Sequence, residues 1–341
     1  MISTVAVVGA GAWGTALAVQ AARAGHAPTL WVYERELLPL LRERRENPWY
    51  LPGVRLPDAV TPVGSLADAG AELVVVAVPS QVLRRVAVEL ASHLRPATRI
   101  LSATKGLEEE GFARASEILT AATGADTARV AVLSGPTFAL EVAEERPTAA
   151  VLASRDGSLA RELQQALATP AFRLYTQSDV VGVELGGALK NVMAIAAGIS
   201  DGLELGTNAR AALLTRGLAE MTRLGVALGA RAATFAGLAG MGDLVLTCTG
   251  QLSRNRRLGL ALARGTSLAE WQGGTRSVAE GVPTTRAAMT LAQRVGVAMP
   301  IVGEVAAVLF GGKPPREALT SLLAREARPE EEPEAPVPRR S

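Results

Sequence analysis

The sequence predicts an α/β fold with a doubly wound, mostly parallel sheet, followed by an all-α helical domain. Short apolar runs recur through the first half of the chain with helical segments between them, a glycine-rich turn follows the first run, and strand-like runs largely disappear beyond about residue 179. Because 341 residues exceed one typical domain, we expect two domains with separate cores. We place them at residues 1–178 and 179–327, with a tail at 328–341.

Short apolar runs are typical of buried parallel strands, and they stand at residues 5–8, 29–32, 73–78, 99–101, 130–133 and 149–153. The segments between them, such as 81–94 and 108–122, have the length and periodicity of crossover helices. In the second domain, stretches rich in Ala and Leu predict helices at residues 180–199, 209–228, 254–264, 284–295 and 301–310. The tail is dominated by Pro, Glu and Arg, a composition typical of disorder.

Composition argues against several classes of function. The 35 basic and 33 acidic residues leave a net charge of +2, which does not indicate a nucleic-acid partner. Two His and the single Cys248 supply neither a metal site nor a disulfide, so we expect no metal and a reducing, cytoplasmic location. The apolar start lacks a basic segment and is interrupted by glycines, and residues 295–310 contain Pro300 and Glu304, so we expect no membrane span.

The turn after the first strand carries the pattern G-x-G-x-x-G, with Gly9, Gly11 and Gly14 at the three glycine positions. The first glycine permits a tight turn, the second lets a pyrophosphate approach the backbone, and the third allows close packing of helix on strand. A strand before the pattern and a helical run after it provide the context that the pattern needs. The sequence therefore predicts a Rossmann domain that binds a dinucleotide with its phosphates at a helix N-terminus.

Two neighbouring charges bear on which dinucleotide binds. Glu34 stands 20 residues after Gly14, where an acidic residue typically meets the ribose of NAD. Arg35 follows directly and suits the 2′-phosphate of NADP. Surface Glu and Arg are common, so either residue could instead be a solvated charge. The sequence leaves the choice between NAD and NADP open.

Two segments that follow strands are candidates for a substrate site. Lys105 comes directly after the strand at 99–101, and ligands bind outside the carboxyl ends of strands in such sheets. Residues 134–137 (Ser-Gly-Pro-Thr) follow the strand at 130–133 and expose a hydroxyl and backbone N–H groups. A lysine in this place suits an anion or a carbonyl. The alternatives are a surface lysine and an ordinary turn.

Lys190 lies in a predicted helix, one turn after Gly186 and Gly187. Helical side chains lean toward the N-terminus, so Lys190 lies over a turn that lacks Cβ atoms. Two glycines inside a helix cost about 1 kcal/mol each, which indicates that something needs this room. A lysine with a tuned pKa could protonate a carbonyl oxygen there as hydride arrives at its carbon. The alternative is close helix packing with an incidental lysine.

The last candidate combines residues 240–243 (Gly-Met-Gly-Asp) with residues 253–257 (Ser-Arg-Asn-Arg-Arg). Ser253 suits the N-cap of a helix, which would place Arg254 and Asn255 in the first turn, where free N–H groups favour a phosphate. Cations at a helix N-terminus oppose the helix dipole unless an anion lies nearby. The alternative is a solvated basic patch.

Taken together, these segments closely resemble the prokaryotic NAD(P)-dependent glycerol-3-phosphate dehydrogenase family. The resemblance covers about residues 4–323, and its specificity lies in the number and order of the matching strings. The strings are Gly-Ala-Gly-Ala-Trp-Gly-Thr at 9–15, Val-Pro-Ser at 78–80, Thr-Lys-Gly-Leu-Glu at 104–108, Ser-Gly-Pro-Thr-Phe-Ala at 134–139, Leu-Gly-Gly-Ala-Leu-Lys-Asn at 185–191, Thr-Arg-Gly-Leu-Ala-Glu at 215–220, Gly-Asp-Leu-Val-Leu-Thr-Cys-Thr at 242–249, Ser-Arg-Asn-Arg-Arg at 253–257 and Val-Ala-Glu-Gly at 278–281.

The resemblance implies an NAD(P)-binding Rossmann domain and a helical domain that reversibly reduce dihydroxyacetone phosphate to sn-glycerol 3-phosphate for glycerophospholipid synthesis. Lys190 would donate or accept the proton, Lys105 would help it to polarise the C2 carbonyl, and Asp243 would orient Lys190 or accept a substrate hydroxyl hydrogen bond. The implied substrate contacts are Lys105, Gly135, Thr137, Lys190, Asp243, Ser253, Arg254 and Asn255. The implied cofactor contacts, besides the three glycines, are Ala12, Trp13, Lys105, Ala139, Arg254, Val278 and Glu280, with Tyr50 as a weaker one.

One departure from the family concerns the cofactor. Where the family often has Arg or His two residues beyond the Trp that ends the second strand, this chain has Tyr33, followed by Glu34 and Arg35. We expect all three side chains to lie near the adenosine end of the cofactor. Because of this departure, the family's usual assignment to NADP does not carry over directly to this chain.

Other functions and properties are left open by the sequence. A related two-domain β-hydroxyacid or ketopantoate-type reductase would take a carboxylate in place of the phosphate, and an idle NAD(P)-binding sensor would bind without turnover. A nucleic-acid binder is disfavoured by the near-neutral charge and by the few aromatic side chains. A homodimer through the helical domain and feedback regulation are not readable from the sequence.

Overall fold

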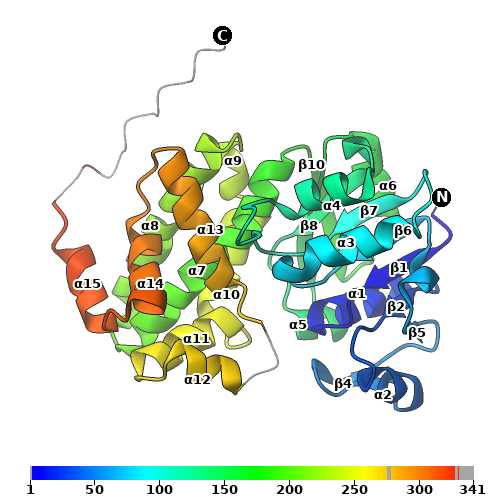
Figure 1. Ribbon diagram of the computed structural model, residues 1–341, viewed down its shortest axis with the longest axis horizontal. Helices are drawn as coiled ribbons and strands as arrows, with labels where there is room; N and C mark the ends of the chain where they lie inside the picture. The colour runs from blue at the N-terminus through cyan, green and yellow to red at the C-terminus, as the bar shows by residue number, and fades with distance from the viewer. Residues whose placement is uncertain (1, 275–277, 327–328, 330–341) are drawn as a thin grey trace, which may run out of the picture.

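The computed structural model describes residues 2–274, 278–326 and 329 (Figure 1). Two parts lie side by side in it, and we call them the sheet region (residues 2–178) and the helical region (residues 179–326). The predicted tail at 328–341 lies outside the described residues except for Pro329. The predicted order of a sheet followed by helices is confirmed.

The sheet has eight strands in the order β10-β9-β8-β7-β6-β1-β2-β5. All six predicted strands are present, and the sequence missed β5 and β10. Their bounds are β1 Val5–Val8, β2 Thr29–Trp31, β5 Thr61–Val63, β6 Leu73–Val76, β7 Arg99–Ser102, β8 Val130–Ser134, β9 Thr148–Ser154 and β10 Phe172–Gln177. A separate hairpin, β3 Glu46–Asn47 with β4 Leu51–Arg55, lies beside the sheet.

The expectation that the run at 149–153 is a parallel strand is wrong in its direction. β9 pairs with β8 in the antiparallel sense, whereas every other neighbouring pair in this sheet is parallel. A parallel neighbour needs a crossover connection that carries the chain back to the end of the sheet at which the preceding strand began. The connection from β8 contains only the five-residue helix α5 Ala139–Ala143, so the chain enters β9 at the same end of the sheet at which β8 ended.

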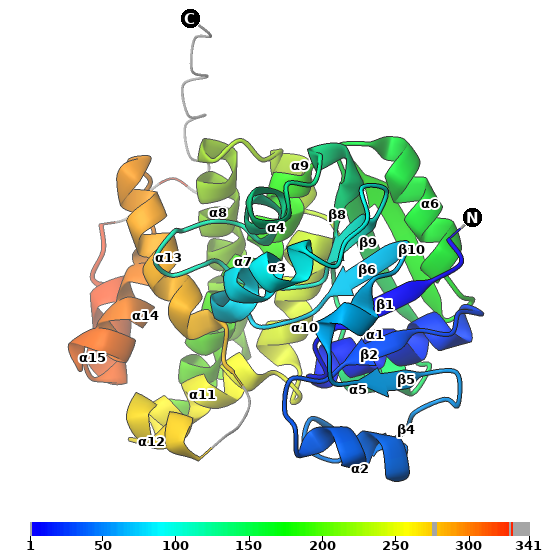
Figure 2. The same ribbon diagram turned by 45° about the vertical axis from the view of Figure 1, so that its right-hand side comes forward.

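Helices cover both faces of the sheet (Figures 1 and 2). The predicted helix at 81–94 begins as a 3-10 turn, and the predicted helix at 108–122 is wrong over its first seven residues. Phe112 has a positive φ of 55°, which a helix does not allow, and the helix starts only after Arg114. The helices and 3-10 turns of this region are α1 Ala12–Arg23, α2 Leu37–Glu43, η1 Leu66–Ala69, η2 Ser80–Val82, α3 Leu83–Ala91, α4 Ala115–Thr123, η3 Thr127–Arg129, α5 Ala139–Ala143 and α6 Gly157–Leu167.

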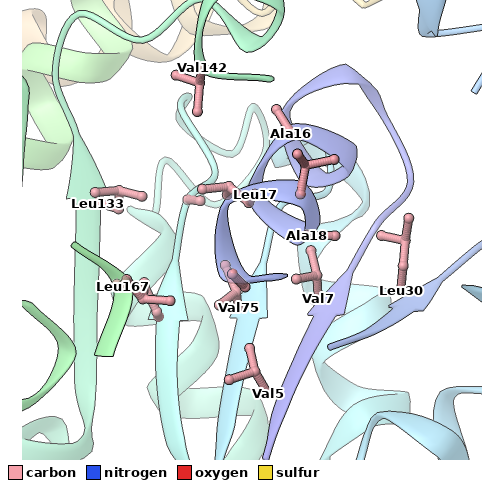
Figure 3. Close-up of a cluster of buried hydrophobic side chains, with 14 of the residues drawn as sticks. Val5, Val7, Ala16, Leu17, Ala18, Leu30, Val75, Leu133, Val142 and Leu167 are labelled. Carbon is pink, nitrogen blue, oxygen red and sulfur yellow. The ribbon is translucent and has the colours of Figure 1, made fainter. Parts of the chain in front are cut away.

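Alternate residues of the central strands supply two apolar cores, one on each face of the sheet. Val5 and Val7 of β1 pack with Leu17 of α1, as Figure 3 shows, while Ala6 and Val8 belong to the core on the other face. Side chains alternate across a strand, so both faces of β1 are apolar because both are covered. This packing fixes the carboxyl ends of the strands, where the predicted site residues follow.

The helical region is built around α7, whose residues are buried almost throughout. The five predicted helices are confirmed to within a few residues at their ends. The elements are α7 Val180–Gly202, α8 Gly206–Ala227, α9 Ala232–Phe235, the π-helical turn η4 Leu238–Gly242, α10 Asp243–Thr249, α11 Arg254–Ala263, α12 Leu268–Gly273, α13 Gly281–Arg294, α14 Pro300–Gly311 and α15 Pro315–Leu323.

Among the described residues, two helical stretches are long and apolar enough to cross a membrane by length and composition alone. They are Val180–Gly202, in which 94% of the most apolar window is buried inside the protein, and Ala232–Thr249, in which 44% is buried. The second stretch is divided among α9, η4 and α10. The burial of α7 among its neighbours is what the central helix of a globular bundle requires.

The crossing of α7 and α11 depends on two glycines that let the helices touch. A Cβ at Gly198 would overlap the carbonyl oxygen of Arg256, and a Cβ at Gly259 would overlap that of Ile195. We expect Gly198→Ala to lower the free energy of unfolding by about 3 kcal/mol, because the helices must separate. Gly303→Ala is the matched control, since a Cβ in α14 meets nothing within 4 Å and should be neutral or stabilising. Urea denaturation compares the two, and equal stabilities would contradict the close contact.

Candidate active site

The site centres on Asp243, whose carboxylate binds two lysines from distant parts of the chain. Lys190 Nζ donates to Asp243 Oδ1 at 2.5 Å, and Lys105 Nζ donates to Asp243 Oδ2 at 2.9 Å. Lys190 lies in α7, Asp243 begins α10, and Lys105 follows β7. In Figures 1 and 2, α7 runs through the middle of the helical region and α10 lies nearer to the sheet, while α7 also packs against β8 and β9. The predicted proximity of these three residues is therefore observed.

Burial tunes the charge of this cluster. Asp243 is fully buried, and the Lys190 side chain is 7% exposed. Burial is the main cause that lowers the pKa of Lys190 to about 8; the charge of Lys105 acts in the same direction, and Asp243 opposes both effects. An ammonium group that titrates near neutral pH can both donate and accept a proton.

The two glycines before Lys190 allow close packing, and the room predicted for Lys190 is taken by other groups. A Cβ at Gly186 would lie 2.5 Å from the carbonyl oxygen of Ala239, and a Cβ at Gly187 would lie 2.5 Å from Ser134 Oγ. The same Cβ at Gly187 would stand 3.9 Å from Lys105 Cγ. The close packing of the alternative is thus observed, whereas Lys190 is buried and ion-paired and is not an incidental surface lysine. This packing brings the second lysine close to α7.

Gly135 and Thr137 converge on Lys105. Lys105 Nζ donates to the Gly135 carbonyl oxygen at 2.8 Å and to Thr137 Oγ1 at 3.0 Å. Gly135 has a φ of +125°, a conformation that only glycine adopts readily. The turn after β8 therefore holds the lysine that follows β7, and both join Asp243.

Two further side chains belong to the site: Thr247, which the sequence reasoning missed, and Ser134, which lies in the predicted segment 134–137. Thr247 is buried and accepts a hydrogen bond from Lys190 Nζ at 2.9 Å. Its position four residues after Asp243 puts it on the same face of α10, which is the signal that could have found it. Ser134 Oγ is also buried, and it has no hydrogen-bond partner among the described residues. This hydroxyl packs against Gly187 of α7.

The basic segment at 253–257 begins a helix, as predicted. Ser253 Oγ accepts a hydrogen bond from Arg256 N at 3.2 Å and so caps α11, and Arg254 is exposed in the first turn. Asn255 is buried and has an additional structural role. Its Nδ2 donates to Asn191 Oδ1 at 2.9 Å, and its Oδ1 accepts from Gly281 N at 3.0 Å, which ties α11 to α7 and α13.

Glu280 joins the two regions at the edge of the site. Its carboxylate accepts hydrogen bonds from Ser80 N at 3.0 Å and from Ser80 Oγ at 2.5 Å. A Cβ at Gly106 would lie 2.7 Å from Glu280 Oε2, so Glu280 lies next to the segment that carries Lys105. Val278 is 41% exposed nearby in the chain.

The glycine turn has the geometry that the pattern predicts. Gly9 has a φ of +114°, a Cβ at Gly14 would overlap the Gly9 carbonyl, and a Cβ at Gly11 would meet nothing within 4 Å. The space at Gly11 is what a pyrophosphate needs to approach the backbone. Trp13 Nε1 is buried without a hydrogen-bond partner among the described residues, and its ring centroid lies 6.0 Å from Lys105 Nζ. The glycine turn and the cluster of Lys190, Asp243 and Lys105 are therefore neighbours.

The residues predicted at the adenosine end lie beyond β2. Tyr50, in the hairpin, donates from its hydroxyl to Glu34 Oε1 at 2.7 Å. Tyr33 is 62% exposed, and the Arg85 guanidinium lies 5.6 Å from its ring centroid. Arg35 is exposed, and Ala139 begins α5 in a half-buried position.

Comparisons with known proteins follow the same division of the chain. The family model described as NAD-dependent glycerol-3-phosphate dehydrogenase N-terminus matches residues 4–160, and the corresponding C-terminus model matches residues 179–320. A protein of Geobacter sp. (strain M21) named glycerol-3-phosphate dehydrogenase [NAD(P)+] is 52% identical over 333 residues, which cover 97% of this chain and 99% of that protein.

Solved structures agree with the sequence comparison. The crystal structure of glycerol-3-phosphate dehydrogenase from Coxiella burnetii superposes with a TM-score of 0.90 at 40% identity, covering 95% of this chain and 99% of the other. A PanE/ApbA family ketopantoate reductase from Ralstonia eutropha JMP134 gives a TM-score of 0.57 at 17% identity, covering 94% of this chain and 99% of its own. The second likeness shows a shared fold alone.

Proposed function

The chain belongs to the NAD-dependent glycerol-3-phosphate dehydrogenase family, and we propose that it interconverts dihydroxyacetone phosphate and sn-glycerol 3-phosphate with Lys190 as the proton donor. The observation that carries the proposal is the Lys190–Asp243–Lys105 cluster beside the glycine turn. A positioned ammonium group of lowered pKa next to a dinucleotide site is suited to the reduction of a carbonyl. The ketopantoate-type alternative has only the shared fold in its favour.

The residues of the glycine turn fit an NAD(P) cofactor. The open space at Gly11 and the buried, unpartnered Nε1 of Trp13 are features that a bound dinucleotide would use. Gly9 and Gly14 would shape the turn, while Ala12, Trp13, Ala139, Val278 and Glu280 would line the pocket. When bound, the nicotinamide supplies or takes up the hydride.

The chain's own residues would handle the charge and the proton. Arg254 is exposed at the N-terminus of α11, where its charge and the free N–H groups suit the substrate phosphate, with Ser253 and Asn255 fixing the turn. Lys105 would polarise the C2 carbonyl while Gly135 and Thr137 hold its ammonium group. Lys190 would then give its proton to the C2 oxygen, and Asp243 would keep both lysines in place.

A substrate panel tests the proposed reaction. Purified protein should oxidise NADH or NADPH when dihydroxyacetone phosphate is added. Ketopantoate and 2-keto or 3-keto acids of similar size serve as controls, since they offer a carboxylate in place of the phosphate. Turnover of a keto acid without turnover of dihydroxyacetone phosphate would contradict the proposal.

The pH dependence of the two directions should be opposite. Reduction needs protonated Lys190, so kcat/KM for dihydroxyacetone phosphate should be high at neutral pH and fall above pH about 8, the pKa of Lys190. Oxidation needs neutral Lys190, so kcat/KM for sn-glycerol 3-phosphate should rise through the same pH. Steady-state rates over pH 6 to 10 check this, and parallel profiles in the two directions would contradict the role of Lys190.

We propose further that the sheet and helical regions are two domains with their boundary between residues 178 and 179, as the bounds of the two family matches support.

A homodimer through the helical region is also proposed. A largely apolar groove of about 1810 Å³ runs between α8, α14 and α15 and offers a surface for a second copy. Light scattering should give twice the monomer mass, and a monomer mass would contradict the dimer. A cytoplasmic role in supplying glycerophospholipid synthesis completes the proposal.

A further inference from the structure

We propose that this chain favours NAD over NADP through the Glu34 carboxylate, which Tyr50 and Asn47 hold in place beyond the carboxyl end of β2. The inference rests on the proposed function, because it concerns which form of the cofactor the same site takes. Glu34 and Tyr50 would act on the adenosine end of the cofactor, far from the reacting atoms.

Glu34 lies where the adenosine ribose should arrive. Trp31 ends β2 and pairs in register with Val8 at the end of β1. The Trp31 carbonyl oxygen accepts a hydrogen bond from Gly9 N at 3.3 Å, so the glycine turn touches the end of β2 directly. In a Rossmann domain the ribose extends from the glycine turn toward the end of the second strand. Glu34 follows that strand end by three residues.

The hairpin β3–β4 is fastened to the glycine turn by a fully buried amide. Asn47 Nδ2 donates to the Ala10 carbonyl oxygen at 2.8 Å and to Thr15 Oγ1 at 2.8 Å. Asn47 Oδ1 in turn accepts from Tyr50 N at 3.1 Å. Because Asn47 is 0% exposed, these bonds fix the position of Tyr50 relative to the turn.

Tyr50 orients the Glu34 carboxylate. Its hydroxyl donates to Glu34 Oε1 at 2.7 Å, whereas Oε2 accepts no hydrogen bond from the described residues. An oriented carboxylate with an available oxygen suits a ribose hydroxyl donor. The 2′-phosphate of NADP would replace that donor with negative charge against the same carboxylate.

The cations near Glu34 do not form a comparable site for a 2′-phosphate. Tyr33 is neutral, and the Arg85 guanidinium lies over its ring at 5.6 Å. Arg35 is exposed, and no hydrogen bond or ion pair holds its side chain among the described residues. The oriented group at this position is therefore the acid, whose carboxylate Tyr50 holds.

Calorimetric binding of 5′-ADP and 2′,5′-ADP tests the inference without any turnover. We expect the unmodified protein to bind 5′-ADP at least about tenfold more tightly. Glu34→Gln should reduce this ratio to about threefold or less, because the repelling charge is gone. Tyr50→Phe should weaken 5′-ADP several-fold, roughly as expected for one hydrogen bond, and leave 2′,5′-ADP unchanged. Glu36→Gln is the matched control, since this neighbouring carboxylate is exposed and caps nothing.

Three results would overturn the inference. They are tighter binding of 2′,5′-ADP by the unmodified protein, equal ratios in the Glu34 and Glu36 variants, and selective loss of 2′,5′-ADP binding in Arg35→Ala with no effect of Glu34→Gln. The proposed function fails by a different measurement, namely absence of dihydroxyacetone phosphate reduction with either NADH or NADPH.

Discussion

Lys190→Ala is expected to lower kcat for dihydroxyacetone phosphate reduction by about a thousandfold, as is typical for removal of a positioned general acid. The fold should survive, because Asp243 keeps its ion pair with Lys105 and its hydrogen bond with Thr247. KM for the substrate should change little if Arg254 holds the phosphate. Steady-state rates at saturating cofactor, with thermal melting of the variant, measure both expectations.

The chain offers a sharp control for this variant. It contains only three lysines, and Lys313 forms an ion pair with Glu304 at 2.6 Å in the helical region. Lys313→Ala should therefore leave kcat unchanged. Addition of methylammonium to Lys190→Ala should restore part of the rate if the missing group is a proton donor. Unchanged turnover in Lys190→Ala would remove this residue from the mechanism.

Asp243→Asn is expected to damage both activity and stability, because it leaves two lysines facing each other without a counter-charge. The pKa of Lys190 should fall below about 8, since Asp243 is the group that raises it. In the pH profile for reduction, the fall of kcat/KM at high pH should therefore begin at a lower pH. The free energy of unfolding should drop by about 3 kcal/mol, the usual cost of breaking a buried ion pair.

Asp201→Asn separates these two effects. Asp201 also bridges two cations, with Arg210 and Arg256 each 2.6 Å away, and its side chain is 7% exposed. This variant should lose stability on a similar scale while its pH–rate profile keeps the original midpoint. A shift of the profile in Asp201→Asn, or none in Asp243→Asn, would show that Asp243 does not tune Lys190.

Much of the fold follows from patterns that lie within single segments. The apolar runs and the helical periodicity predicted six strands and five long helices, because each pattern depends on local burial. The direction of β9 does not follow from a local pattern, because it depends on where the chain lies relative to the sheet after the short helix α5. β5 was missed because it has three residues and contains Pro62, and β10 was missed because three of its six residues are exposed.

The candidate site likewise combines residues with local signals and contacts between distant segments. Lys105 and Gly135 were predicted from their place after strands, and Ser253 from its place before a helix, which are local signals. The bridge from Lys105 to Asp243 spans 138 residues, so only the packed structure brings it together. Gly186 and Gly187 were noticed for the right reason, their cost in a helix, but the groups that fill their space come from η4 and β8.

The ion pair between Lys105 and Asp243 also constrains how such enzymes can be recombined. One partner is carried by the nucleotide-binding half of the gene product and the other by the half that holds α10. A chimera that joins halves from two relatives inherits a working pair only if both parents keep these positions and the same docking of α7 on β8. A hybrid that loses either position should therefore fold but be weakly active.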